Sequence, residues 1–300
     1  MSADAPANQK LTEVSYWDGV HSVEDQVRSL EAPNAGREPA LAPARAGIKA
    51  RLKKLLGPRL LTSMRAYDDY LLWDVILPRY LAGRRGAKVV EIGSAPGELL
   101  VRLHARFDLV PYGIEYSPRG AEMNQRVFTA HGLDPANVIQ TDFLAPEVHG
   151  RYRESFDVVL SLGFIEHFRN VEDVVAKHLN LLRPGGLLIV GVPNLRGVNL
   201  PLCWLFHREV VAMHNLDIMA PKRFAALFPG EQVERLFCGH FGTFSFGLFT
   251  TPPGSLMGLV LAGCMKAQLL FNAIFRLLFE DRGAESRWFS THLLFVGVKR

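Results

Sequence analysis

The chain has 300 residues, 48 % of them hydrophobic and 21 % charged, and 34 Lys and Arg against 30 Asp and Glu give a formal net charge of +4. This length fits one large domain with additions or two small domains, and the composition excludes collagen-like, coiled-coil and wholly disordered chains. Three distant cysteines exclude a disulfide framework and a CxxC zinc site, and favour a reducing compartment (Cys203, Cys238 and Cys264). The first ten residues lack the basic and apolar segments of a secretory signal.

Residues 1–85 are predicted to form an N-terminal arm or lid. Tyr16 and Trp17 are large aromatic side chains in a polar stretch, and we expect them either to close over a bound ligand or to anchor the arm. Seven basic and no acidic residues lie between positions 45 and 65, where apolar residues at helical spacing predict a short basic amphipathic helix. A second helix is predicted over 63–81.

From residue 88 the sequence alternates short apolar segments with helical ones. Strands are predicted at 88–92, 109–115, 137–141, 156–162 and 187–192, and helices at 97–107, 118–131 and 171–182. Strands separated by helices of this length form βαβ units, with helices on both faces of the sheet. The sequence therefore predicts a doubly wound α/β sheet for residues 86–300.

Ligands of such sheets bind at the carboxyl ends of the strands, so the residues that follow each strand are the candidate site. The first strand is followed by a glycine loop, EIGSAPGE, that leads into a helix whose first N–H groups are free. Glu115 ends the second strand, and Asp142 and Phe143 follow the third. The fourth strand ends in the sequence SLGFIEHF, which contains Ser161 and His167.

These segments, in this order, resemble the class I S-adenosylmethionine-dependent methyltransferases. The group that this chain resembles includes the ubiquinone-biosynthesis O-methyltransferases. The resemblance rests on the segments EIGSAPG, GIE, TDF, FDVVLSLGFIEHF and LRPGGLLIVGVPN. The resemblance runs from about residue 89 to 194 and continues weakly to a last strand at 293–298. It implies a seven-stranded, mostly parallel, Rossmann-like sheet with S-adenosylmethionine as cofactor.

The resemblance implies that the glycine loop binds the methionine part of the cofactor. Gly93 and Gly97 would hold this part, the backbone of Ser94 and Ala95 would line it, and Glu91 would orient the loop near the amino group. The chemistry of the residues agrees, because a sulfonium ion with an amino group is attracted to carboxylates and carbonyl oxygens. The loop lacks the lysine of a phosphate-binding loop.

The resemblance assigns the rest of the cofactor to residues after the second, third and fourth strands. Glu115 would bind the ribose hydroxyls, Asp142 the adenine amino group and Phe143 the edge of the adenine ring. Ser161 and Leu162 would lie beneath the sulfonium. A nicotinamide-dependent dehydrogenase is disfavoured, because its loop would have the spacing GxGxxG. A non-catalytic scaffold of the same fold is also disfavoured, since it would not need all of these cofactor-binding residues: Glu91, Gly93, Gly97, Glu115 and Asp142.

Methyl transfer to a hydroxyl group needs a base, and we expect His167 or His214 to supply it. His167 follows Glu166 at the start of a helix, so a capping role is the structural alternative. Relatives in the quinone pathway can have an acidic residue, implicated in metal binding, where this chain has Gly163. Glu166 and His167 alone are too few for a hard-cation site, so we predict no metal.

The acceptor is expected to be a small or lipid-like molecule with a hydroxyl group, with N- or C-methylation as alternatives. Nucleic acid is disfavoured, because the NPPY or DPPY sequence typical of base-amino methylation is missing after the fourth strand. We expect the substrate to be chosen by the arm and by insertions at about 195–220 and 250–285.

The apolar excess is concentrated at 256–279, a length that could span a bilayer. Lys266 places a charge near the middle of this segment, which argues against a bilayer crossing. The predicted last strand also argues against it, because this strand must pair with the same sheet as the earlier ones. We therefore expect one or two helices, packed partly on the sheet and partly exposed. Together with the basic segment, this predicts a cytoplasmic protein that contacts an anionic membrane surface; packing in the core or in a dimer is the alternative.

Overall fold

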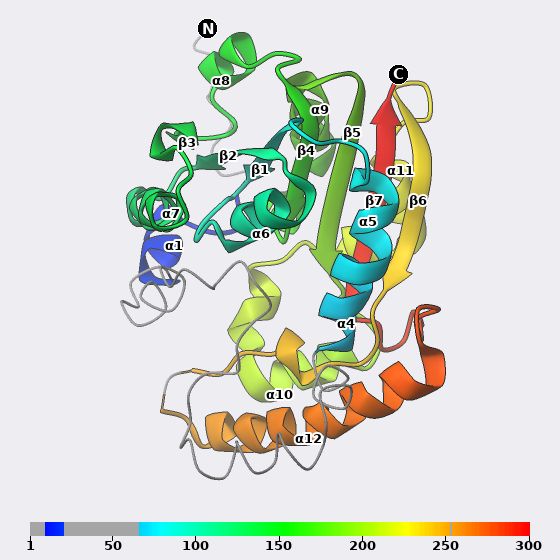
Figure 1. The fold of residues 1–300 in the computed structure, drawn as a ribbon. Coiled ribbons are helices and arrows are strands. Elements are labelled where there is room, and N and C mark those ends of the chain that lie inside the picture. Colours follow the sequence, from blue (N-terminus) through cyan, green and yellow to red (C-terminus); the bar gives the residue numbers. More distant parts are fainter. Residues whose placement is uncertain (1–9, 21–65, 253) are drawn as a thin grey trace, which may run out of the picture.

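The computed structural model describes residues 10–20, 66–252 and 254–300 (Figure 1). The predicted basic helix at 45–65 lies outside these ranges. The described residues form one twisted sheet with helices on both of its faces, and further helices lie across one end of it (Figure 1).

The sheet has seven strands in the order β3-β2-β1-β4-β5-β7-β6. Their bounds are Lys88–Ile92 (β1), Val110–Glu115 (β2), Val138–Gln140 (β3), Phe156–Leu162 (β4), Leu182–Pro193 (β5), Val233–Phe241 (β6) and His292–Lys299 (β7). The first five strands are parallel, whereas β7 is antiparallel to both β5 and β6. The predicted doubly wound, mostly parallel sheet is confirmed.

Successive residues of the central strands enter two separate cores, one on each face of the sheet. In β5, Leu187 and Ile189 pack into one core, while Leu188 and Val190 pack into the other. The first core is covered by η1 (Leu71–Ile76), α5 (Leu77–Leu81), α6 (Glu98–Phe107) and α7 (Pro118–Ala130). The second is covered by α8 (Pro146–Arg151), α9 (Val171–Leu181), α10 (Asn199–Ala212) and α11 (Pro221–Ala226). This burial on both faces is why the strands are almost continuously apolar.

Two differences from the predicted elements have local causes. The strand β5 begins at Leu182 and not at residue 187, because Leu182 pairs with Phe156 before a register shift leads into the regular ladder. The predicted helix over 63–81 is described from Tyr67 and is continuous through α4 (Tyr67–Tyr70), η1 and α5. Its middle turns are π-helical and bury Trp73.

The predicted insertion before the last strand is one helix, α12 (Leu256–Phe279). It lies below the carboxyl ends of the strands, across the same end of the sheet as α10 (Figure 1). It packs against α10, α4 and the short helix η5 (Phe246–Leu248), and its outer side is exposed. The expected packing on the sheet itself is therefore replaced by packing on other helices. The arm contributes α1 (Val14–Val20), which lies next to α7 (Figure 1).

Candidate active site

A cavity of about 170 Å³ lies at the carboxyl ends of β1 to β4. The predicted site residues that line it are Gly93, Ala95, Glu115, Asp142, Phe143, Leu162 and His167. Sequence reasoning missed several others: Lys10, Thr12, Tyr116 and Phe164. The arm closes one side of the cavity with Trp17, so the space left is smaller than the about 300–1,000 Å³ of usual ligand pockets.

The glycine loop after β1 requires glycine at two positions. Gly93 and Gly97 have φ angles of +74° and +96°, in the region that other residues rarely adopt. A Cβ at Gly97 would lie 2.3 Å from Oδ1 of Asn124, and one at Gly93 would lie 2.9 Å from Cδ2 of Phe164. Asn124 also donates to the hydroxyl of Ser94 at 2.7 Å, which fixes the loop from below. Gly97 and Ser94 shape the loop without lining the cavity.

Two buried carboxyl groups, Glu91 and Glu115, lie behind this loop. Burial and the neighbouring Glu115 raise the pKa of Glu91 well above its ordinary value. Glu115 accepts hydrogen bonds from the N–H groups of Ala95 and Ser117 at 3.2 and 2.9 Å, yet burial still raises its pKa. Oε2 of Glu91 has no hydrogen-bond partner among the described residues. A bound cation would relieve both groups, because it favours the charged form of each carboxyl group.

Asp142 is held by the arm. Its Oδ2 accepts from Nζ of Lys10 at 2.6 Å, and its Oδ1 accepts from the N–H of Leu144 at 3.0 Å. The Lys10 ammonium also lies 4.6 Å from the centre of the Tyr116 ring. Asp142 thus lines the cavity with one oxygen paired to Lys10 and the other to a backbone N–H.

Ser161 does not line the cavity. Its side chain is fully buried, and its hydroxyl lies 3.1 Å from Nε2 of His178. Leu162, the next residue, lines the cavity in its place. The alternation of side chains along β4 explains the difference, because neighbouring residues of a strand point to opposite faces.

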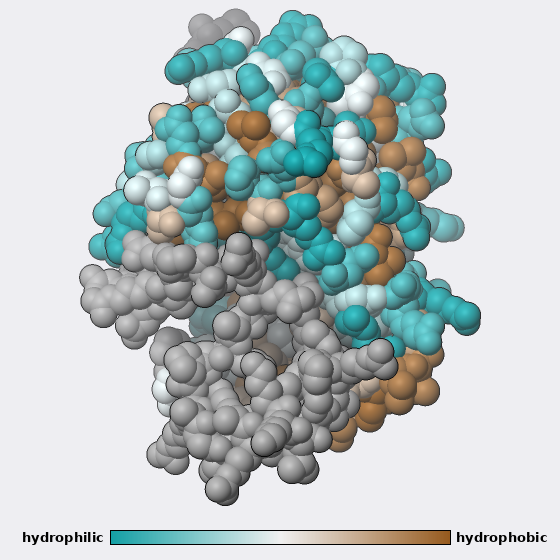
Figure 2. Space-filling view, viewed as in Figure 1, coloured by the Kyte–Doolittle hydropathy of each residue, from teal (hydrophilic) through white to brown (hydrophobic). Residues whose placement is uncertain are grey.

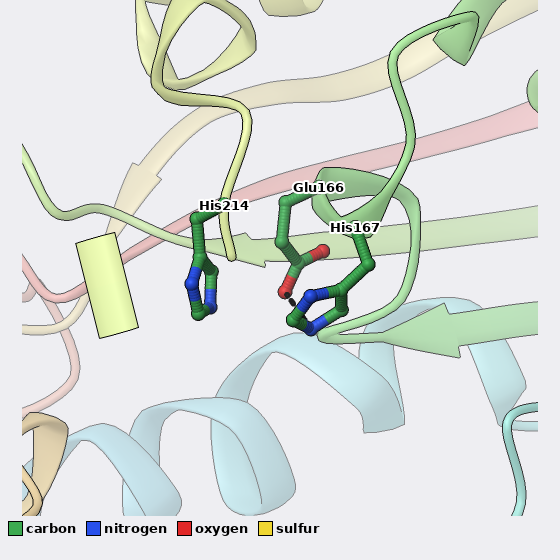
Figure 3. A group of neighbouring side chains, drawn as sticks. All are labelled: Glu166, His167 and His214. Carbon is green, nitrogen blue, oxygen red and sulfur yellow. Dashed lines mark ion pairs between the residues drawn. The ribbon is translucent and has the colours of Figure 1, made fainter. Parts of the chain in front are cut away.

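A cluster that the sequence did not predict consists of Glu166, His167 and His214 (Figure 3). The helical turn η3 (Ile165–His167) provides the first two, and His214 follows α10. Ligand atoms of all three lie within 4.8 Å of one another, and the rings of His167 and His214 are 4.6 Å apart. The carboxyl group of Glu166 points toward His167, and its Oε1 lies 3.9 Å from Nε2 of that ring (Figure 3). A second hollow of about 500 Å³ borders His214.

Both imidazoles are held in the same tautomer. Nδ1 of His167 lies 2.9 Å from the carbonyl of Met213, and Nδ1 of His214 lies 2.7 Å from that of Val210. A carbonyl only accepts, so Nδ1 carries the hydrogen in each ring and Nε2 of the neutral ring is an acceptor. Burial lowers the pKa of His167 to about 4, with a smaller effect of His214, and burial also lowers the pKa of His214.

Glu166 is fully enclosed, and burial raises its pKa to about 8. Its Oε2 has no hydrogen-bond partner within the described part of the chain. The cluster can therefore act chemically in two ways: as neutral imidazoles that accept a proton, or as a His-His-Glu set of divalent-metal ligands. Two histidines oriented by carbonyls are typical of metal sites as well.

The arm is tied to this cluster by several contacts. The N–H of Leu11 donates to the carbonyl of His167 at 2.7 Å, and the ring of Trp17 meets that of His167 edge-on with centroids 5.1 Å apart. Away from the cluster, the hydroxyl of Ser117 at the start of α7 donates to Asp18 of the arm at 2.6 Å. Trp17 thus lines the cavity, whereas the neighbouring Tyr16 is 39 % exposed.

Comparison with known proteins gives relatives of one general kind. A ubiquinone biosynthesis O-methyltransferase of Cupriavidus pinatubonensis is 32 % identical over 115 residues, 38 % of this chain and 44 % of the relative. A tRNA U34 carboxymethyltransferase of Desulfotalea psychrophila is 28 % identical over 121 residues, 40 % of this chain and 37 % of the relative. The chain thus spans less than half the length of these curated relatives.

Solved structures share the fold at low sequence identity. Phosphoethanolamine N-methyltransferase 2 of Haemonchus contortus, in complex with S-adenosyl-L-methionine, has a TM-score of 0.53 and 13 % identity, and the match covers 96 % of this chain and 60 % of that chain. The [4+2]-cyclase SpnF has a TM-score of 0.50 and 14 % identity, and the match covers 83 % of this chain and 94 % of that chain.

The sequence also matches a family described as "Methyltransferase domain" over residues 64–242. This segment contains the glycine loop, both buried carboxyl groups and the Glu-His-His cluster. Because it makes up more than half of the chain, the protein belongs to the methyltransferase domain family.

Proposed function

We propose that this protein is an S-adenosylmethionine-dependent methyltransferase that acts on a hydroxyl group of a small or lipid-like acceptor. The observation that carries the proposal is the cavity at the carboxyl ends of β1 to β4, which Glu115, Asp142 and His167 line together. Membership of the methyltransferase domain family and the ubiquinone-pathway O-methyltransferases among the relatives support it.

The residues of the cavity fit the cofactor. Glu115 lines the cavity, whereas the predicted site residue Glu91 lies behind the glycine loop without lining it. Both are buried carboxyl groups that a positively charged ligand would stabilise, and Oε2 of Glu91 lacks a partner among the described residues. Glu115 would hold the ribose hydroxyls, Asp142 the adenine amino group and the glycine loop the methionine part. When bound, S-adenosylmethionine supplies a methyl group that is already activated on a sulfonium ion. Trp17 and the arm would exclude water from the cavity.

His167 is proposed to take the proton of the acceptor at Nε2. Its Nδ1 is engaged by Met213, its Nε2 is free to accept, and burial lowers its pKa to about 4, so the ring is neutral at physiological pH. A general base typically contributes about 10²–10⁴-fold to a rate, and orientation of the reactants contributes more. His214, whose ring contacts that of His167 and borders the second hollow, would assist His167 in accepting this proton.

The fold alone does not decide the reaction, because a [4+2]-cyclase shares it. Two experiments separate the possibilities. Calorimetry measures binding of S-adenosylmethionine and S-adenosylhomocysteine to the wild type and to Glu115→Gln. Transfer of a labelled methyl group is then measured with alkylated phenols and catechols, and with matched amines. Labelled ether products support O-methylation, labelled amines would support N-methylation, and binding without turnover on any acceptor would support a scaffold.

We also infer that the protein is cytoplasmic and peripheral to the membrane. Cys203, Cys238 and Cys264 are free thiols in the structure, which fits a reducing compartment, and the outer side of α12 is apolar. Fractionation of cells tests the location: we expect the protein in a membrane pellet from which high salt or carbonate releases it. Release by detergent alone would contradict a peripheral location.

A further inference from the structure

The helix α12 turns most of its large apolar side chains outward, unlike an ordinary surface helix. Ten of the nineteen large apolar side chains that are exposed within the described ranges lie on it, among them Leu259, Leu270 and Leu277 at 74, 65 and 80 % exposure. A surface helix of a soluble protein normally turns its apolar stripe inward. Apolar patches of this continuity mark an interaction surface.

The inner side of α12 is held by polar groups. Gln268 and Asn272 are 3 and 4 % exposed and share a hydrogen bond of 3.0 Å. Gln268 also accepts from the N–H of Phe246 at 3.0 Å and donates to the carbonyl of Phe244 at 3.3 Å. Leu261 and Phe275 pack against the protein beside these amide groups, whereas the outward side is mainly apolar. This arrangement fits an apolar environment outside the molecule.

The contacts of α12 exclude a bilayer crossing, although its length and composition would permit one. Gln268 lies in the middle of the helix and is tied to the segment that precedes it. Phe275, near the end of the helix, stacks on Tyr67 of α4 with ring centroids 6.4 Å apart. After the helix, β7 returns to the sheet between β5 and β6. The helix is thus fixed along the side of the domain and can enter a membrane only parallel to its surface.

The charges on α12 favour a lipid surface over another protein copy. The helix has no acidic residue, and Lys266 is exposed among the outward apolar side chains. A basic side chain in this position can reach lipid phosphates while its stem stays among apolar groups.

We propose that α12 lies in the plane of an anionic lipid bilayer, with Leu259, Leu270 and Leu277 among the acyl chains and Lys266 at the phosphates. Figure 2 shows apolar surface at the end of the molecule where Figure 1 places α12. The neighbouring α10 exposes Trp204 (62 %), a residue type enriched at membrane interfaces.

The cavity and α12 lie at the same end of the sheet, since both follow the carboxyl ends of the parallel strands (Figure 1). Docking through α12 would therefore turn the site toward the lipid. A lipid-like acceptor could enter from the bilayer without crossing water. The membrane contact stands independently of the reaction; only the delivery of the acceptor rests on the proposed function.

Vesicle flotation tests the proposal. The full chain is mixed with vesicles of phosphatidylcholine alone, or with phosphatidylglycerol added, and the bound fraction is measured. We expect binding to the mixed vesicles, and at least a tenfold loss for the triple variant Leu259→Glu, Leu270→Glu, Leu277→Glu. Lys266→Glu should weaken binding to the anionic vesicles by about fivefold or more and leave binding to neutral vesicles less affected. Val110→Glu and Leu236→Glu, at exposed apolar positions of β2 and β6, are the matched controls.

Several outcomes would overturn the proposal: no binding by the wild type, equal binding by the triple variant, or equal loss in the controls. A wild-type dimer that the triple variant abolishes, without vesicle binding, would assign the surface to a second copy. If the triple variant does not fold, Lys266→Glu and the single change Leu277→Glu decide instead. Calorimetry with S-adenosylmethionine on the same samples keeps the two proposals apart, because vesicle binding without cofactor binding contradicts only the reaction.

Discussion

Replacing Glu166 by glutamine should stabilise the protein by an amount that grows with pH. Burial raises the pKa of Glu166 from 4.5 to about 8, so the folded state keeps a proton that the unfolded state releases. The stability of the wild type is therefore fully present below the unfolded pKa and is lost as the pH rises toward the folded pKa. Glutamine has nearly the same shape and no charge to bury, so the variant escapes this loss.

The size of the effect follows from the two pKa values. The linkage relation gives a cost of about 1.4 kcal/mol at pH 5.5 and about 4 kcal/mol at pH 8, so the advantage of Glu166→Gln should widen by about 3 kcal/mol between them. With a urea m-value of about 3 kcal/mol/M, the midpoint difference should grow by about 1 M.

Urea unfolding at the two pH values, with a chelator present, measures this difference. The chelator matters because a bound cation would hold Glu166 in its charged form. Glu122→Gln, on the exposed side of α7, removes the same charge from a solvated position and should show no widening. If the difference in urea midpoint between Glu166→Gln and the wild type is equal at both pH values, the conclusion that this carboxyl group is neutral in the folded protein is refuted.

Four further results are expected. His167→Gln should lower kcat by about 10²–10⁴-fold without changing cofactor affinity. The rate of labelled methyl transfer by the wild type should fall only as the pH drops toward about 4, and not near 6.5, because burial lowers the pKa of His167. Gly97→Ala should abolish cofactor binding in calorimetry, because its Cβ meets Asn124, whereas Gly132→Ala, with φ of +71° and open space, should bind normally. Asp142→Ala should weaken binding by about 10- to 150-fold, and unchanged affinity would contradict the adenine assignment. Turnover should survive a metal chelator; its loss would assign the histidine cluster to a metal instead.

The cofactor-binding half of the fold was predictable because its signals are local. Strands β1 and β4 have the predicted bounds, 88–92 and 156–162, and β2 and α7 each differ by one residue at one end. Apolar segments, turn residues and the order of the motifs determine this part. The conformational demands at Gly93 and Gly97 were likewise visible as glycines at a fixed spacing.

The rest depends on contacts between distant residues, which spacing does not reveal. Lys10 and Asp142 are separated by 132 positions, and no local pattern indicates that they pair. His167 and His214 come from different elements, so their contact depends on how α10 turns back toward η3. In α12, composition predicted a helix, but not that Gln268 would face inward.

The place of β7 in the sheet has a consequence for biosynthesis. This strand lies between β5 and β6, yet both are made before it. Until β7 leaves the ribosome, β5 has one unpaired edge, β6 has no strand partner, and the apolar α12 has already been synthesised. Unpaired strand edges and exposed apolar surface are the features that draw nascent chains into aggregates. The yield of folded protein would therefore depend on chaperone or membrane contact during this interval. It would depend less on the stability of the finished protein.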